Sequence, residues 1–194
     1  MNLNKTIGFL GFILFVYGAI SAILFSSPIW FSFYAIGGTF FIGYINVKLK
    51  NTSILKEFNN KKLIFLLNYA FYVFAAVLIE LLGRGLLNLW YYPSFDFAKT
   101  AIHVFLIGYP FSFFFIRESY ILVGKFVKNK VWVFVLTAIS NALIHEIPNT
   151  FAWEWKYTIS FLPIELLNIN ILVILGWFFL VFVAIVVDKI KIKN

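Results

Sequence analysis

Long apolar runs separated by short polar segments dominate the sequence. Most runs reach the length of about 20 residues that an α-helix needs to cross the hydrocarbon core of a bilayer. We therefore predict six transmembrane helices, at 6–26, 29–46, 63–90, 97–122, 131–152 and 160–187. Residues 47–62 form the one extended hydrophilic stretch. The pattern predicts an all-α polytopic membrane protein in which residues 1–194 form a single integral membrane domain.

The basic residues indicate the orientation of this domain, because Lys and Arg accumulate on the cytoplasmic side of membranes. Of the 16 basic residues, 13 fall on one predicted face, Lys99 and Lys156 fall on the other, and Arg84 lies inside a helix. Both termini are therefore predicted to be cytoplasmic, and the loops at 91–96 and 153–159 to face outward. We expect a multi-pass protein of the plasma (inner) membrane.

Composition excludes other classes of protein. Hydrophobic residues make up 62% of the chain and charged residues 12%, which is more apolar surface than a soluble domain of 194 residues buries. The net charge of +8 is explained by the topology signal, so no nucleic-acid partner is predicted. The absence of cysteine excludes disulfides and thiolate catalysis.

Polar residues inside the predicted helices form two stripes. Glu80, Arg84 and Asn88 recur at every fourth residue of one helix, and Asn141, His145 and Asn149 do so in another. Residues four apart share a helix face, and ionisable residues within spans usually have a partner or a role. Both stripes approach the predicted outer end, so we expect an outward-facing polar pocket there.

Neighbouring segments are expected to complete this pocket. His103 lies near the outer start of the fourth predicted helix, and Glu165 and Asn168 lie early in the sixth. The candidate catalytic residues are Glu80, Arg84, His103, His145 and Asn149. The candidate substrate-binding residues are Asn88, Trp90, Asn141, Trp153, Trp155, Glu165 and Asn168. Glu146 is left outside the pocket, because it lies about 100° around the helix from His145.

These residue types suit hydrolysis. Glu80 is expected to act as a general base, with His103 or His145 as its acid or water-positioning partner and Asn149 as an oxyanion donor. A metal ion at Glu80, His103 and His145 is a further option, although no cofactor is predicted. The structural alternative is an intrahelical ion pair between Glu80 and Arg84, with His145 and the two asparagines as polar contacts between helices.

A family resemblance points in the same direction. The stretch Glu80-Leu-Leu-Gly-Arg84 resembles the E-E-x-x-x-R signature of the CAAX-protease and bacteriocin-processing family of intramembrane proteases, and His145 with Asn149 resembles its H-x-x-x-N element. Ile79 stands in place of the first Glu of that signature, and Lys99 in place of a Phe. The resemblance implies a glutamate-activated water and a membrane-associated or prenylated substrate.

Two further resemblances leave other functions open. Six helices with an outward pocket resemble the substrate-binding membrane subunits of energy-coupling-factor vitamin transporters, in which case the small residues Gly18 and Ala22 would contact a partner subunit. Pro163-Ile-Glu165 resembles the P-x-E-E element of membrane lycopene cyclases, which act on isoprenoids. A non-catalytic membrane interaction protein is the remaining alternative.

An internal repeat is visible at an offset of 65 residues. Glu80 and the segment Trp90-Tyr91-Tyr92 align with His145 and the segment Trp155-Lys156-Tyr157. This match predicts related helical hairpins at 63–122 and 131–187. Taken together, the sequence predicts a membrane-embedded enzyme with a Glu/His/Asn/Arg site for a lipid-associated or isoprenoid-bearing substrate. Its expected partners are the lipid bilayer and a hydrophobic or amphiphilic small ligand.

Overall fold

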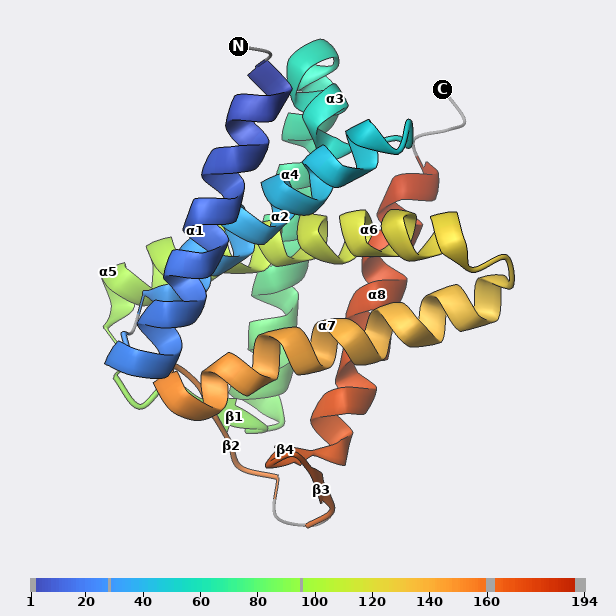
Figure 1. Ribbon diagram of the computed structural model, residues 1–194. Helices are drawn as coiled ribbons and strands as arrows, with labels where there is room; N and C mark the ends of the chain where they lie inside the picture. Colours follow the sequence, from blue (N-terminus) through green and yellow to red (C-terminus); the bar gives the residue numbers. More distant parts are fainter. Residues whose placement is uncertain (1–2, 28, 95, 160–162, 191–194) are drawn as a thin grey trace.

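The computed structural model describes residues 3–27, 29–94, 96–159 and 163–190, which fold predominantly as helices (Figure 1). The α-helices are α1 (Leu3–Phe25), α2 (Trp30–Lys48), α3 (Ile54–Asn60), α4 (Lys62–Glu80), α5 (Phe97–Thr100), α6 (Tyr109–Phe126), α7 (Lys130–Ala152) and α8 (Ile171–Ile190). Two π-helical segments, η1 (Leu81–Leu86) and η2 (Ala101–Gly108), continue α4 and precede α6. The short strands are β1 (Trp90–Tyr91), β2 (Lys156–Tyr157), β3 (Glu165–Leu166) and β4 (Ile169–Asn170).

Five helical stretches in the described part of the chain are long and apolar enough to cross a membrane. They are Leu3–Phe25, Lys62–Leu86, Phe97–Phe126, Lys130–Ala152 and Ile171–Asp188. The prediction of a helical fold is confirmed, and the five apolar stretches indicate a membrane protein. The remaining predicted span, 29–46, forms α2, which is not among the five.

Helices α1 and α2 pack through glycines. A Cβ atom at Gly37 of α2 would lie 2.2 Å from the backbone nitrogen of Phe15, and one at Gly18 of α1 would lie 2.6 Å from that of Tyr34. Such close backbone approach is typical of small residues at helix contacts in membranes. Ala22 on the same face is fully buried. The Gly18/Ala22 face, predicted to contact a partner subunit, is therefore occupied by α2.

The two ends of the molecule have different character. The start of α1, the end of α8 and α3 lie at one end, whereas β1 to β4 lie at the other, with α6 and α7 crossing between them (Figure 1). We call these the α3 end and the strand end. Between them, Tyr72 of α4, Phe113 and Phe114 of α6 and Val181 of α8 form part of a buried core.

The helix predicted at 160–187 begins eleven residues later than expected. Residues 165–170 form the β3–β4 hairpin, in which Glu165 pairs with Asn170, while residues 160–162 lie outside the described residues. Leu167 and Asn168 have φ angles of 53° and 62°, which a helix does not accommodate. Glu165 and Asn168 are consequently exposed hairpin residues rather than pocket residues within a span.

Two other predicted boundaries also change. The hydrophilic stretch 47–62 contains α3, whose first turn is capped because the Ser53 hydroxyl accepts a hydrogen bond from the backbone N–H of Leu55. The helix predicted at 63–90 ends at Leu86 in η1, and Asn88 then turns the chain with a φ angle of 49°.

Candidate functional site

Glu80 lies at the end of α4, with 5% of its surface exposed. One carboxylate oxygen accepts hydrogen bonds from the Trp90 indole at 3.1 Å, the Tyr92 hydroxyl at 2.5 Å and the Tyr109 hydroxyl at 2.8 Å. The other oxygen lies 3.3 Å from Nε of Arg84. Glu80 and Arg84 therefore form the ion pair of the structural alternative, and aromatic donors complete the surroundings of the carboxylate.

Glu146 on α7 has a similar set of donors. Its carboxylate accepts hydrogen bonds from the Trp155 indole at 3.2 Å, the Tyr157 hydroxyl at 2.8 Å and the Trp177 indole at 3.0 Å. The side chain is 3% exposed. Sequence reasoning placed this residue outside the site, yet it is the carboxylate held by the second Trp-x-Tyr segment.

Strands β1 and β2 explain how two distant segments reach these carboxylates. They pair antiparallel, with Trp90 opposite Tyr157 and Tyr91 opposite Lys156. Each Trp-x-Tyr segment donates from its Trp and its Tyr to the glutamate of the helix that precedes it. The arrangement around Glu80 is thus repeated around Glu146, with the strand direction reversed.

His145 belongs to the core. It is fully buried, and its Nδ1 lies 2.9 Å from the backbone oxygen of Asn141. The ring packs against those of Phe31, Tyr34, Phe115 and Trp177. The 65-residue offset that aligned Glu80 with His145 holds for the Trp and Tyr residues, whereas the carboxylates are 66 residues apart.

The predicted asparagines shape the backbone. The amide of Asn149 donates to the backbone oxygen of Trp155 at 2.9 Å and accepts from its N–H at 3.3 Å, closing the turn after α7. The Asn141 amide donates to the Thr137 carbonyl at 2.9 Å. The backbone oxygen of Asn88 accepts a hydrogen bond from the Thr158 hydroxyl. The contacts of Asn149 and Asn88 hold Trp155 and the residue after β2, whereas the Asn141 contact lies within α7.

His103 and Trp153 lie apart from both carboxylates. Nδ1 of His103 is 3.2 Å from the hydroxyl of Ser32 on α2. Trp153 is half-exposed, and the Lys156 ammonium lies 4.4 Å from its ring centre. The three residues proposed for a metal ion, Glu80, His103 and His145, have separate partners, and no group of three or more metal-binding acids or histidines occurs within the described ranges.

A cavity of about 300 Å³, which we call the Glu146 cavity, lies between η1, α6, α7 and α8. Among the described residues that line it, Glu146 is the one carboxylate. The polar wall also includes Trp90, Tyr92, Tyr109, Ser112, Trp155, Tyr157 and Trp177. The apolar wall is Phe31, Ile79, Leu82, Gly83, Leu87, Leu89, Val104, Ile159, Leu172, Val173, Gly176, Phe179 and Leu180.

The Glu146 cavity reaches the apolar surface between η1 and α8. Leu82 on η1 is 53% exposed and Phe179 on α8 is 58% exposed. Gly176 of α8, which also lines the cavity, is exposed, and a Cβ atom added there would meet no atom within 4 Å. The exposed part of the cavity lining is therefore apolar. Nearer the α3 end the helices close up, because the Tyr72 hydroxyl of α4 donates to the Ala184 carbonyl of α8.

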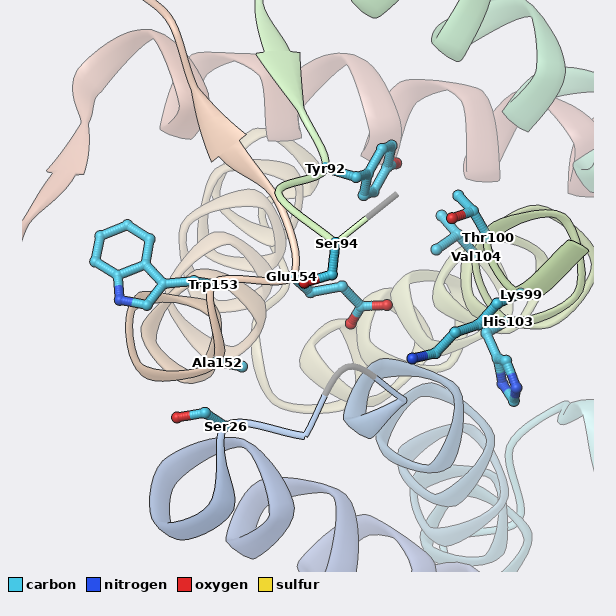
Figure 2. A pocket seen from close by; sticks show the side chains of 10 residues that line it. All are labelled: Ser26, Tyr92, Ser94, Lys99, Thr100, His103, Val104, Ala152, Trp153 and Glu154. Carbon is cyan, nitrogen blue, oxygen red and sulfur yellow. The ribbon is translucent and has the colours of Figure 1, made fainter. Parts of the chain in front are cut away.

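A smaller pocket of about 90 Å³, which we call the Glu154 pocket, lies near the strand end. Figure 2 shows its lining residues. It is lined by Ser26, Tyr92, Ser94, Lys99, Thr100, His103, Val104, Ala152, Trp153 and Glu154. Burial raises the pKa of Glu154 to about 8, against the opposing effects of the Lys99 ammonium and the Phe31 backbone N–H. Two candidate site residues, His103 and Trp153, thus line this second pocket.

Comparison of the chain with protein-family models, curated proteins and solved structures finds no match.

Proposed function

We propose that this chain is a membrane-embedded enzyme that takes a lipid-associated or isoprenoid-bearing substrate into the Glu146 cavity. The observation that supports this proposal is a buried carboxylate in the wall of an apolar cavity whose opening is flanked by exposed Leu82 and Phe179. In a bilayer such an opening faces hydrocarbon, so an apolar chain enters without crossing water. A water-soluble ligand gains no comparable route.

In this proposal Glu146 exchanges the proton. Its hydrogen-bond donors are two indoles and one phenol, all uncharged. Glu80, by contrast, has Nε of Arg84 3.3 Å from its carboxylate. A carboxyl group without a cationic neighbour is the better general acid or base for an apolar substrate, because either protonation state is accessible to it. Hydrolysis of a bond next to the lipid chain is the reaction class we propose.

The proposed topology has six spans, including α2, with both termini cytoplasmic in the plasma membrane. The 13-to-2 distribution of basic residues supports it. The loops after η1 and α7, which contain β1 and β2, then face outward, and the Glu146 cavity lies in the outer half of the membrane.

The cavity is tested by filling it. Gly176→Leu adds a side chain where the structure leaves space, and Gly124→Leu is the matched control, because it also lies on an exposed helix face away from the cavity. We expect the wild type and Gly124→Leu, purified in mild detergent, to retain a single-chain or isoprenoid lipid detected by mass spectrometry. Gly176→Leu should lose it. Equal lipid in all three proteins would contradict the proposal.

The chemistry is tested with Glu146→Gln. We expect this variant to retain the lipid and to lose conversion of polyprenyl and acyl-lipid substrates incubated with the reconstituted protein, as followed by mass spectrometry. Unchanged conversion in Glu146→Gln would exclude Glu146 as the proton-exchanging group. A water-soluble vitamin bound at one molecule per protein would support the transporter-subunit alternative instead.

A further inference from the structure

The Glu154 pocket adjoins the Glu146 cavity. Tyr92 and Val104 line both of them, so these two residues form a shared wall. The Glu146 cavity is predominantly apolar, whereas the lining of the Glu154 pocket includes four hydroxyl groups, that of Tyr92 among them, one imidazole, one amine and one carboxyl group beside Val104, Ala152 and Trp153. This juxtaposition of an apolar and a polar compartment matches the two parts of an amphiphile.

Glu154 indicates that the polar pocket is built for a ligand. The side chain is 9% exposed, and its Oε2 is buried without a hydrogen-bond partner among the described residues. A polar atom that is buried and unpaired is costly, so such an atom requires an explanation. Figure 2 shows the Glu154 carboxyl and the Lys99 amine extending towards one another across the pocket.

We infer that the Glu154 pocket binds the compact anionic head group of an amphiphile whose hydrocarbon chain occupies the Glu146 cavity. This inference rests on the proposed function and adds the class of substrate to it. Lys99 supplies a positive charge, and Ser94 and Thr100 supply hydroxyl donors. The volume of about 90 Å³ accommodates several water molecules, at about 10–15 Å³ each, and therefore a phosphate- or carboxylate-sized group.

The protonated Glu154 carboxyl completes the donor set. With its pKa raised by burial to about 8, Glu154 is predominantly neutral at pH 6.5 and donates a hydrogen bond to an anion. When ionised it repels the anion and attracts Lys99. The other titratable groups that line the pocket are His103 of η2, whose Nδ1 lies beside the Ser32 hydroxyl, and Tyr92, whose pKa is raised well above its usual value by burial and by Glu80.

The test measures binding of dodecyl phosphate and dodecanol to the purified protein in dodecyl maltoside, by isothermal titration calorimetry. We expect dodecyl phosphate to bind the wild type at least tenfold more tightly than dodecanol at pH 6.5. Lys99→Met should remove this difference and leave dodecanol binding unchanged. If the phosphate adds no affinity in the wild type, or Lys99→Met retains the full difference, the inference is wrong.

Variation of pH provides the second arm. At pH 9 only about one tenth of Glu154 is protonated, so we expect dodecyl phosphate to bind the wild type about tenfold more weakly than at pH 6.5. Glu154→Gln keeps a neutral side chain at both pH values, so its affinity for dodecyl phosphate should not show this tenfold decrease. Titration of the phosphate itself is common to both proteins and cancels in the comparison. Equal pH dependence in both would contradict the role of Glu154.

Two controls separate this inference from the proposed function. Dodecanol binding that is abolished by Gly176→Leu supports the Glu146 cavity alone, whereas absence of dodecanol binding in the wild type contradicts the proposed function itself. If inorganic phosphate binds as tightly as dodecyl phosphate, the pocket is a site for a free anion, and the inference that its ligand is an amphiphile is wrong. Preference for dodecyltrimethylammonium over dodecyl phosphate would overturn the charge assignment.

Discussion

The two carboxylates at the strand end differ in charge balance although their aromatic donors are alike. Glu80 has Arg84 at 3.3 Å, and Arg84 also lies 5.9 Å from the centre of the Tyr92 ring. The donors to Glu146 are uncharged. Because a charge in an apolar site is costly without a counter-charge, we infer that the first carboxylate holds the strand end together and the second is available for chemistry.

Gly83 controls the position of Trp90. A Cβ atom there would lie 1.8 Å from the Trp90 ring, so Gly83→Ala displaces the indole and weakens its hydrogen bond to Glu80. We expect a loss of about 1–3 kcal/mol in the free energy of unfolding, as is typical of overpacking. Gly85→Ala on the same π-helical segment is the control, because its nearest neighbour is 3.7 Å away. Equal stability of the two variants, measured by thermal unfolding in detergent, would contradict this account.

Glu154 makes stability depend on pH. Its pKa is about 8 in the folded protein and near the ordinary 4.5 when unfolded, so the folded state binds the proton more tightly. The stabilising contribution is therefore complete below about pH 4.5, falls as pH rises, and is lost once pH has passed 8. We expect the melting temperature of the wild type to fall between pH 5 and 8 more than that of Glu154→Gln. The same slope in both proteins would show that another group is responsible.

At the scale of elements, a buried ion-pair group joins three helices at the α3 end. Arg117 of α6 donates two hydrogen bonds to Glu57 of α3 and lies 2.8 Å from Asp188 of α8. Glu118 accepts from the first N–H of α3, at Ile54, at 2.7 Å. These contacts fix α3, which by its length of seven residues is too short to be stable alone.

Removing the arginine should release α3 and α8 together. Arg117 is 4% exposed, so Arg117→Met leaves Glu57 and Asp188 without their shared cation. We expect a loss of about 3–5 kcal/mol in the free energy of unfolding, as for other broken buried pairs. Lys125→Met near the exposed end of α6 should change stability by less than about 0.5 kcal/mol. Chemical denaturation in detergent measures both, and equal effects would contradict the proposed role of Arg117.

Element type was predictable from sequence wherever hydrophobicity alone decides it. The apolar runs predicted α1, α7 and the continuous helical stretches Lys62–Leu86 and Phe97–Phe126 within a few residues, because a long apolar segment has few alternatives to a membrane helix. The β3–β4 hairpin was not predicted, because the apolar composition of residues 164–172 is compatible with either a hairpin or a helix. Asn168 is only a weak turn signal. The π-helical form of η1 and η2 has no hydrophobic signal.

The candidate site was predicted in part for a similar reason. Spacing identified Glu80 with Arg84 and the two Trp-x-Tyr segments, all of which meet at the strand end. It selected His145 instead of Glu146, because which of the two faces the cavity depends on the rotation of α7. That rotation is set by rings from other helices that pack around His145. The exact repeat of Trp and Tyr, with a glutamate near each, was the available signal.

At the scale of the whole molecule, the polar groups are divided between the two ends. The strand end contains the buried carboxyl groups of Glu80, Glu146 and Glu154 and both pockets, and the α3 end contains the Arg117 group and the beginning of α1. The antiparallel pairing of β1 and β2 joins the segments that follow η1 and α7. The proposed hairpins at 63–122 and 131–187 therefore contribute equivalent parts to a single strand end.

The proposed orientation predicts that the strand end faces outward and the α3 end faces the cytoplasm. The chain contains no cysteine, so a single introduced cysteine reports one position without interference. Asn60 at the α3 end and Glu165 in the β3–β4 hairpin are both exposed and suit this purpose, whereas Leu55 is fully buried and would not react from either side.

We expect a membrane-impermeant maleimide to label Glu165→Cys in intact cells and Asn60→Cys only after permeabilisation. Thr52→Cys, also exposed beside α3, should behave like Asn60→Cys because a helix too short to cross the bilayer keeps both positions on one side. Labelling of Asn60→Cys in intact cells would reverse the orientation and place the Glu146 cavity in the inner half of the membrane. Opposite accessibility of Thr52→Cys and Asn60→Cys would contradict the arrangement of α2, α3 and α4, because both residues lie in the segment that joins the predicted second and third spans.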